Sequence, residues 1–353
     1  MATANAPEPV PIVFKARGLE IDTRLRVFDT VFHVHSTILK LHSQYFYRFL
    51  DSADKAAGTN DGGFEYDWVT KIVDGGNDWQ LICSGPNAGD LKLAEWKTCP
   101  HVNSGKRMQT NAFQNVLRAM YALPYVLNQG YSIIIMTELA RFYMCLPIIS
   151  QTLDGAISRS QKYFGIQVSI FSCQMLSAAV ELRHMTLFKD ALIWSLGPFS
   201  QPKFYDIADK SLKRVAELHY YKLRSIILED IQRILKCVSH ADAFEGGAGP
   251  GRVIFEHGMA AEATAARHSN DATSFTPRLL NSMCEEAKRE RDHGDDDGLY
   301  DQLKSLLRND LSMDLGSLRV AGSEAPGGYP DYFLLSTIDS DDDYPWDVTQ
   351  LEW

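Results

Sequence analysis

The stretch at residues 24–50, RLRVFDTVFHVHSTILKLHSQYFYRFL, changes its hydrophobic period within one short segment. Its first part holds two runs of β-branched and aromatic residues, which are typical of short strands. These runs include Leu25, Val27, Val31 and Val34. From Ser36 onward, apolar residues recur every three or four positions, which predicts a helix. The stretch therefore predicts a β-hairpin leading directly into an amphipathic helix, within an α+β domain.

The same stretch contains the pattern F-x-V-H, then I-L, then S-x-x-F. Its residues are Phe32, Val34, His35, Ile38, Leu39, Ser43 and Phe46. In order and spacing this pattern resembles the BTB/POZ signature, and it is closest to fungal BTB proteins, which have a long insertion after the first helix. One residue departs from the pattern, because Ser36 stands where the family often has lysine. The resemblance implies a short β-hairpin and a small sheet packed on helices.

Two later segments extend the resemblance. The run F-x-x-V-L-x-A-M-Y at 113–121 is similar to the third BTB helix. Residues 137–143 and 146–149 resemble the closing helix pair of the family, with Pro147 in the first turn of the last helix. The resemblance thus implies a BTB/POZ-like domain over residues 19–164, with an insertion at about 51–110.

The remaining chain divides by composition. Residues 1–18 are rich in alanine and proline and are expected to be flexible. Residues 165–240 continue with amphipathic patterns, which predict an α-helical extension. Residues 241–353 carry 23 Asp and Glu against 9 Lys and Arg and begin with a glycine-rich run, so we expect an acidic, largely disordered tail.

Charge and composition exclude several classes of protein. The net charge of −10 and the acidic tail argue against nucleic-acid binding, which needs clustered cations. The most apolar window, 131–149, is interrupted by charged residues and a proline, so it predicts a buried helix pair and no membrane contact. The six cysteines form no C-x-x-C pair, and no secretory signal is visible, so we expect an intracellular protein of the cytoplasm or nucleus.

The sequence offers no pattern for an enzyme, a cofactor or a metal. A phosphate-binding loop, a dinucleotide fingerprint, a nucleophile elbow and an H-E-x-x-H helix are all missing. His33 and His35 can share one face of a strand, but a metal needs three or four ligands. Cys99 and His101 lie in a predicted loop and have the same weakness. We therefore expect a non-enzymatic chain.

The resemblance implies a protein–protein interaction module that acts as a scaffold or adaptor. BTB domains commonly self-associate through the first helix and the N-terminal segment. The corresponding contact residues here are Phe14, Leu19, Leu25 and Leu39. These side chains could instead fill the core of the monomer, and the sequence leaves both readings open.

Two narrower functions remain as alternatives. BTB adaptors of cullin-type ubiquitin ligases contact the cullin near the third helix, normally through an apolar residue followed two positions later by glutamate. Residues 103–114, NSGKRMQTNAFQ, contain no glutamate, which weakens the expectation of a cullin partner. A transcription regulator that acts through partners is the other alternative.

Overall fold

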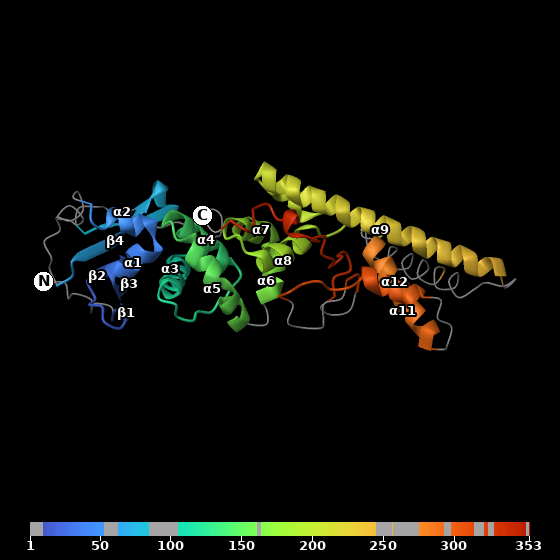
Figure 1. Cartoon of the computed structure of the whole chain (residues 1–353), viewed down its shortest axis with the longest axis horizontal. Coiled ribbons are helices and arrows are strands. Elements are labelled where there is room, and N and C mark those ends of the chain that lie inside the picture. The colour runs from blue at the N-terminus through green and yellow to red at the C-terminus, as the bar shows by residue number, and fades with distance from the viewer. Residues whose placement is uncertain are drawn as a thin grey trace, which may run out of the picture. The chain divides into compact units, whose positions relative to one another are not determined.

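A computed structural model of the chain describes residues 10–52, 63–84, 105–160, 164–244, 256, 275–292, 298–313, 321–323, 328–350 and 353. The chain forms two compact units, which contain its first and second halves (Figure 1). Unit 1 comprises Met1–Gln161 together with Trp353, and unit 2 comprises Lys162–Glu352. Both helices and a sheet are present, so the α+β class predicted from the sequence is confirmed.

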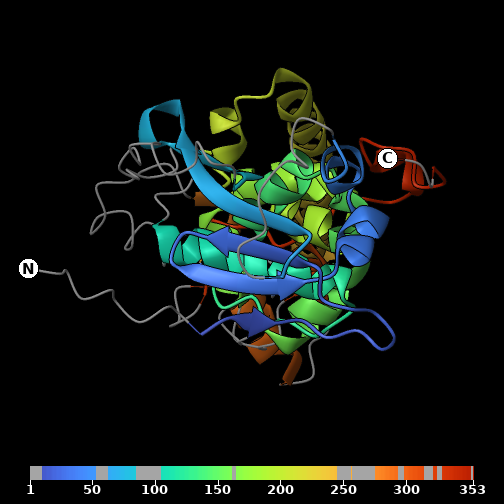
Figure 2. The same ribbon diagram turned by 90° about the vertical axis from the view of Figure 1, so that its left-hand side faces the viewer.

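Unit 1 contains one five-stranded sheet with the order β1-β3-β2-β4-β5. Its strands are β1 (Ile12–Val13), β2 (Thr23–Val27), β3 (Thr30–Val34), β4 (Tyr66–Val73) and β5 (Asp78–Cys83). β2 and β3 form the predicted antiparallel hairpin, in which Leu25 lies opposite Phe32. β1 pairs parallel with β3, and β4 pairs parallel with β2. Figure 2 shows β2 and β3 in front, with helix α3 behind them.

Five helices complete the described part of unit 1. They are α1 (Ser36–His42), α2 (Gln44–Phe49), α3 (Lys106–Met120), α4 (Tyr131–Phe142) and α5 (Leu146–Arg159). The single helix predicted from Ser36 is divided at Ser43, which has an extended backbone. The Ser43 hydroxyl accepts a hydrogen bond from the Phe46 backbone N–H at 3.1 Å and so caps α2. Pro147 lies in the first turn of α5, as predicted.

The core of unit 1 is rich in aromatic side chains. Trp68 from β4 and Phe46 from α2 are almost completely buried. Phe46 stacks on Tyr143, with the ring centroids 5.3 Å apart and the planes at 6°. Because β2 and β3 alternate between buried and half-buried residues, one face of the hairpin supplies this core while the other stays accessible.

One expectation for unit 1 is wrong in the described residues. The N-terminal segment is not flexible throughout, because β1 joins the sheet and the Phe14 N–H donates to the His33 carbonyl at 2.9 Å. Within the stretch expected to be an insertion, at about 51–110, β4 and β5 pair with each other and α3 begins at Lys106. Residues 1–9, 53–62 and 85–104 lie outside the described residues.

Unit 2 is built mainly from helices. They are α6 (Phe164–Ile170), α7 (Ser172–Glu181), α8 (Met185–Ser195), α9 (Lys210–Phe244), α11 (Phe275–Asp292) and α12 (Leu299–Leu306). Short 3-10 turns occur at η1 (Asp74–Gly76) in unit 1, and at η3 (Lys203–Asp206) and η4 (Asp341–Asp343) in unit 2. Among the described residues, no helix is both long and apolar enough to span a membrane.

The expectation of a largely disordered tail at 241–353 is wrong for its described segments. Leu299, Leu303 and Leu306 of α12 are buried, and so are Leu334 and Leu335 of the extended segment 328–350. These leucines recur on one side of α12, so the helix buries an apolar face although acidic residues dominate the region. These described segments of the tail therefore contribute apolar side chains to a core, although the tail as a whole is acidic.

Candidate functional site

The BTB-like signature residues hold unit 1 together. Phe32, Val34, Leu39 and Phe46 are fully buried, and Ile38 is half-buried. Phe32 and Val34 lie on the core face of β3, and Leu39 and Phe46 come from the two helices that follow. The apolar part of the signature is therefore part of the core and is not a binding surface.

The two polar signature residues connect elements that are distant in the sequence. The His35 N–H donates to the Tyr121 hydroxyl at 2.8 Å, and His35 Nδ1 lies 2.7 Å from the same oxygen. The Ser43 hydroxyl donates to the Tyr143 carbonyl at 2.5 Å. Burial raises the pKa of Tyr121, so its hydroxyl stays protonated as it bonds His35. These bonds fix α1 and α2 against the ends of α3 and α4.

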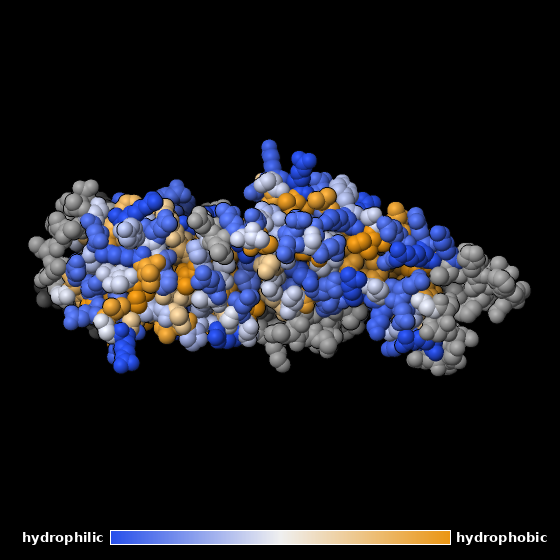
Figure 3. All heavy atoms as spheres, viewed as in Figure 1, coloured by the Kyte–Doolittle hydropathy of each residue, from blue (hydrophilic) through white to orange (hydrophobic). Residues whose placement is uncertain are grey.

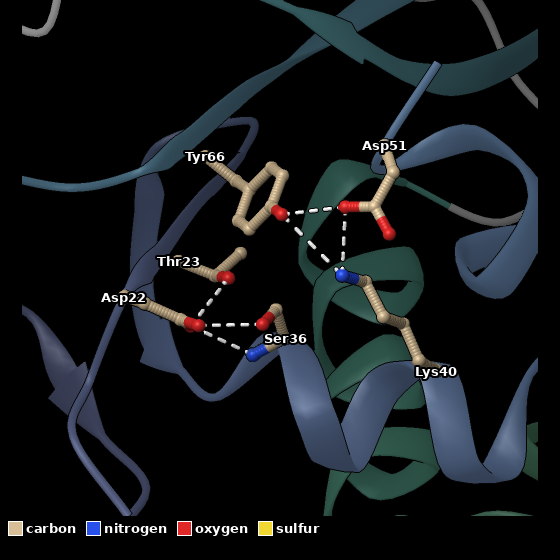
Figure 4. A network of polar contacts seen from close by, with 6 residues as sticks. All are labelled: Asp22, Thr23, Ser36, Lys40, Asp51 and Tyr66. Carbon is tan, nitrogen blue, oxygen red and sulfur yellow. Dashed lines mark hydrogen bonds and ion pairs between the residues drawn. The ribbon is translucent and has the colours of Figure 1, made fainter. Parts of the chain in front are cut away.

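A polar network fixes the start of α1 to the sheet. Asp22 accepts hydrogen bonds from the Thr23 hydroxyl at 2.8 Å, the Ser36 N–H at 2.7 Å and the Ser36 hydroxyl at 2.5 Å. Figure 4 shows these residues converging where β2 begins and α1 begins. A carboxylate at the start of a helix satisfies an otherwise unpaired N–H group, so Asp22 stabilises α1 at this point.

A second cluster lies beside the first in Figure 4. Lys40 of α1 pairs with Asp51 at 2.8 Å, and the Tyr66 hydroxyl donates to Asp51 at 2.6 Å. Hydrogen bonds from Lys40 and Tyr66 lower the pKa of Asp51. Burial, together with the bond to Asp51, raises the pKa of Tyr66. The first cluster joins the start of β2 to α1, and the second joins α1 to β4.

A depression lies on the accessible face of the sheet in unit 1. It is an open groove of about 590 Å³. We call it the sheet groove, and it is lined by Pro11, Arg24, Arg26, Phe28, Asp29, Val31, His33 and Phe64. In the sheet register His33 lies opposite Arg24, and Arg24 lies beside Asp67. Strand pairing thus places a row of polar side chains across the groove floor.

An ion cluster forms part of that floor. Arg24 donates to both carboxylate oxygens of Asp67, at 3.0 and 2.6 Å, and Arg26 donates to one of them at 2.6 Å. Burial alone would raise the pKa of Asp67, but the two guanidinium groups hold it below its usual value. Two guanidinium groups share one carboxylate, so the cluster itself carries a surplus positive charge.

The aromatic wall of the groove is formed by Phe64. Its ring lies 4.6 Å from the His33 ring, centroid to centroid, and the Arg24 guanidinium lies 5.3 Å from the Phe64 centroid. Burial and the nearby Arg24 charge lower the pKa of His33, so this imidazole is neutral at pH 7. Guanidinium donors beside an aromatic ring suit the binding of a polypeptide segment.

The structure corrects the predicted self-association surface. Phe14, Leu25 and Leu39 are buried in the core of unit 1, and only Leu19 is substantially exposed. These three side chains cannot contact a second molecule without opening the core. Of the two readings left open by the sequence, core filling is therefore correct for them.

The structure separates His33 from His35, the histidine pair considered for metal binding. His33 faces the sheet groove, whereas His35 is buried against Tyr121 just beyond the end of β3. Across the described residues, no cluster of three or more potential ligands is present. Cys99 and His101 lie outside the described residues.

Sequence reasoning missed the sheet groove. Its signal was the alternation Arg24-Leu25-Arg26-Val27, in which the apolar residues point to the core and the arginines point away. Phe64 carried no such signal, because only the pairing of β4 with β2 brings the residues before β4 to Arg24. Comparisons with known proteins add no further information, since no family model, curated protein or solved structure matches this chain.

Proposed function

We propose that this chain is a non-enzymatic protein–protein interaction module of the BTB/POZ type, whose unit 1 docks a segment of a partner protein in the sheet groove. The resemblance supplies the class of module, and the groove supplies the docking site. The observation that carries the proposal is the groove itself, which places two arginines, a neutral histidine and two phenylalanines on the accessible face of the sheet.

The chemistry of the groove favours binding over catalysis. Arg26, whose side chain is 41% exposed, offers directional donors, and Phe28, Val31 and Phe64 offer apolar contact area. Binding sites of this composition gain specificity from a few polar groups and affinity from buried aromatic surface.

The described cysteines with the largest pKa shifts are poor nucleophiles. Burial raises the pKa of Cys145 to about 12 and that of Cys284 to about 11. At neutral pH both side chains are therefore thiols, which are much less reactive than thiolates. This agrees with a binding role for the chain.

The proposal is tested by affinity purification with the full chain as bait and quantitative mass spectrometry of the captured proteins. The Arg26→Glu variant reverses a charge in the groove, and the Arg48→Glu variant makes the same change on the exposed side of α2. We expect Arg26→Glu to lose a defined set of proteins that the wild type and Arg48→Glu both capture. Circular dichroism and urea unfolding check that both variants are folded.

The outcomes separate the alternatives. Equal capture by both variants would reject the sheet groove as the docking site. Recovery of a cullin with its RING partner by the wild type would favour the adaptor alternative, with contacts that replace the missing glutamate. Recovery of a chromatin-associated complex would favour the transcription-regulator alternative.

A further inference from the structure

Helix α9 of unit 2 exposes a regular apolar stripe along its outer side. The large apolar residues Leu218, Tyr221, Leu228 and Leu235 have exposed fractions of 57%, 54%, 57% and 47%. Ser225 and Gln232 lie between them and are exposed as well. These six positions alternate in steps of three and four, which is the heptad pattern of a coiled-coil contact. We call them the α9 seam.

The other side of α9 already contributes to the core of unit 2. Leu212, Ala216, Leu223, Ile227 and Ile234 are buried there. The seam is therefore a second apolar face, and it remains exposed in the described part of the chain. Figure 3 shows apolar side chains at intervals over α9, between polar ones. A helix with one core face and a second heptad face has a surface suited to another helix.

We propose that the α9 seam pairs, parallel and in register, with the α9 seam of a second copy of this chain. Leu218, Ser225 and Gln232 then occupy a positions, and Tyr221, Leu228 and Leu235 occupy d positions. Leucine at d favours two-stranded pairing, and polar residues at a positions fix the register. The pairing needs no residue of the sheet groove, so it is independent of the function proposed above.

The charged residues that flank the α9 seam favour a second copy of this chain as its binding partner. In a parallel in-register pair, each g residue faces the e residue of the next heptad in the other helix. Glu217 then meets Lys222 of the second copy, and Arg224 meets Glu229 of the second copy. By symmetry each of these opposite-charge contacts occurs twice. Lys222 also pairs with Asp343 of its own chain, which leaves further donors on its ammonium group.

The antiparallel arrangement of the same seam is disfavoured. When Ser225 of one helix lies against Leu228 of the other, g residues face g residues and e residues face e residues. Arg224 then meets Arg224, and Glu229 meets Glu229. Like charges at such positions oppose association. The charge pattern therefore selects the parallel arrangement.

The short α9 seam is sufficient for dimerisation because α9 is already helical in the single chain. Two isolated peptides of this length would have to form helices before they could pair, which is costly. Here the buried face of α9 holds the backbone helical within unit 2, so the seam is presented in the binding conformation. Pre-organisation of this kind increases affinity without additional contacts.

Sedimentation velocity of the full chain at a series of concentrations tests the proposal. We expect a concentration-dependent dimer for the wild type. The Leu228→Glu/Leu235→Glu variant should weaken dimerisation by at least about a hundredfold, because it places four charges in the apolar layers. Leu41→Glu, an exposed leucine on α1 of unit 1, is the matched control and should leave the dimer unchanged. A wild type that is monomeric at all concentrations, or a seam variant that still dimerises like wild type, would overturn the proposal.

Charge reversal tests the orientation. Arg224→Glu and Glu229→Arg should each weaken the homodimer by about three- to tenfold, because each creates two like-charge contacts. Mixing the two variants should restore association, since the heterodimer pairs Glu with Arg at both sites. Failure of the mixture to associate better than either variant alone would contradict the parallel register.

Disulfide trapping tests which residues face each other across the pair. Ser225→Cys places two thiols opposite each other in the parallel pair and should give an oxidised covalent dimer. Arg233→Cys, an exposed position on the same helix away from the seam, is the control and should not. Equal trapping of the two variants, measured above the background of the native cysteines, would also overturn the proposal.

Discussion

The two units bury a histidine in different ways. In unit 1, His35 bonds Tyr121, and both residues belong to elements that lie before residue 161. In unit 2, His219 of α9 contacts the Thr337 hydroxyl at 2.8 Å, and Thr337 lies 118 residues further along the chain. The core of unit 2 thus depends on the last part of the sequence returning to its helices, whereas the core of unit 1 forms from the first part alone.

The aromatic contacts show the same difference. Phe46 of unit 1 stacks on Tyr143, a residue of the α4–α5 connection. Phe188 of unit 2 contacts Tyr344 and Trp346, with ring centroids 5.6 and 5.2 Å away. The segment 328–350 therefore completes the core of unit 2, although its acidic composition resembles that of a disordered tail. Low average hydrophobicity does not prevent a segment from ordering when its few apolar residues find a surface.

The largest effect on stability is expected when the segment 328–350 is deleted. A chain that stops before Gly328 lacks Phe333, Leu334 and Leu335, which are buried in unit 2. At about 1.5–3 kcal/mol for each buried side chain, the loss is comparable with the whole stability of a domain. We expect hydrogen exchange to show loss of protection in α8 and α9 while α3 and α4 stay protected.

The control for that truncation is a chain that stops after Val348, which keeps every aromatic contact of Phe188 described above. It should retain protection in both units. If the shorter chain keeps α8 and α9 protected, unit 2 does not need its C-terminal segment, and the contrast between the units disappears.

A smaller effect is expected inside unit 1. Phe46→Ala should lower the free energy of unfolding of unit 1 by about 3–5 kcal/mol, because it removes a fully buried ring and leaves a cavity beside Tyr143. Tyr47→Ala, at an exposed position on the same helix, should change it by less than about 0.5 kcal/mol. Urea unfolding measures both. Similar losses for the two variants would show that the stack on Tyr143 does not stabilise unit 1.

The smallest expected effect is the loss of stability of unit 2 when the pH is lowered. Burial lowers the pKa of His219 below its usual value of 6.5, so the unfolded chain binds a proton there more readily than the folded chain. His219 therefore contributes stability that is fully present above pH 6.5 and is lost as the pH falls below it. The slope is at most about 1.4 kcal/mol per pH unit.

Thermal unfolding of unit 2 between pH 7 and pH 5 measures this slope. His219→Gln keeps a hydrogen-bonding side chain without the titration, so we expect a shallower dependence in this variant. An unchanged slope would assign the acid sensitivity to other groups. Asp343 titrates separately at lower pH, because hydrogen bonds from Lys222 and the backbone outweigh burial and lower its pKa to about 2.

The sequence determined the local structure of unit 1. The change of period at residues 24–50 predicted the hairpin and a following helical region, and Pro147 predicted the start of the last helix of that unit. These features depend on neighbouring residues and on the periodicity of strands and helices, which the sequence displays directly. The break at Ser43 was missed, because a serine within a helical pattern does not reveal that its side chain will cap a second helix.

Tertiary structure decided which surfaces remain available. Only the pairing of β4 with β2 assembles the sheet groove from Arg24, Arg26 and Phe64. Only the packing of α9 shows which of its two apolar faces is buried and which forms the α9 seam. Both α9 faces have a similar apolar pattern in the sequence, and the choice between them depends on long-range contacts that periodicity does not encode.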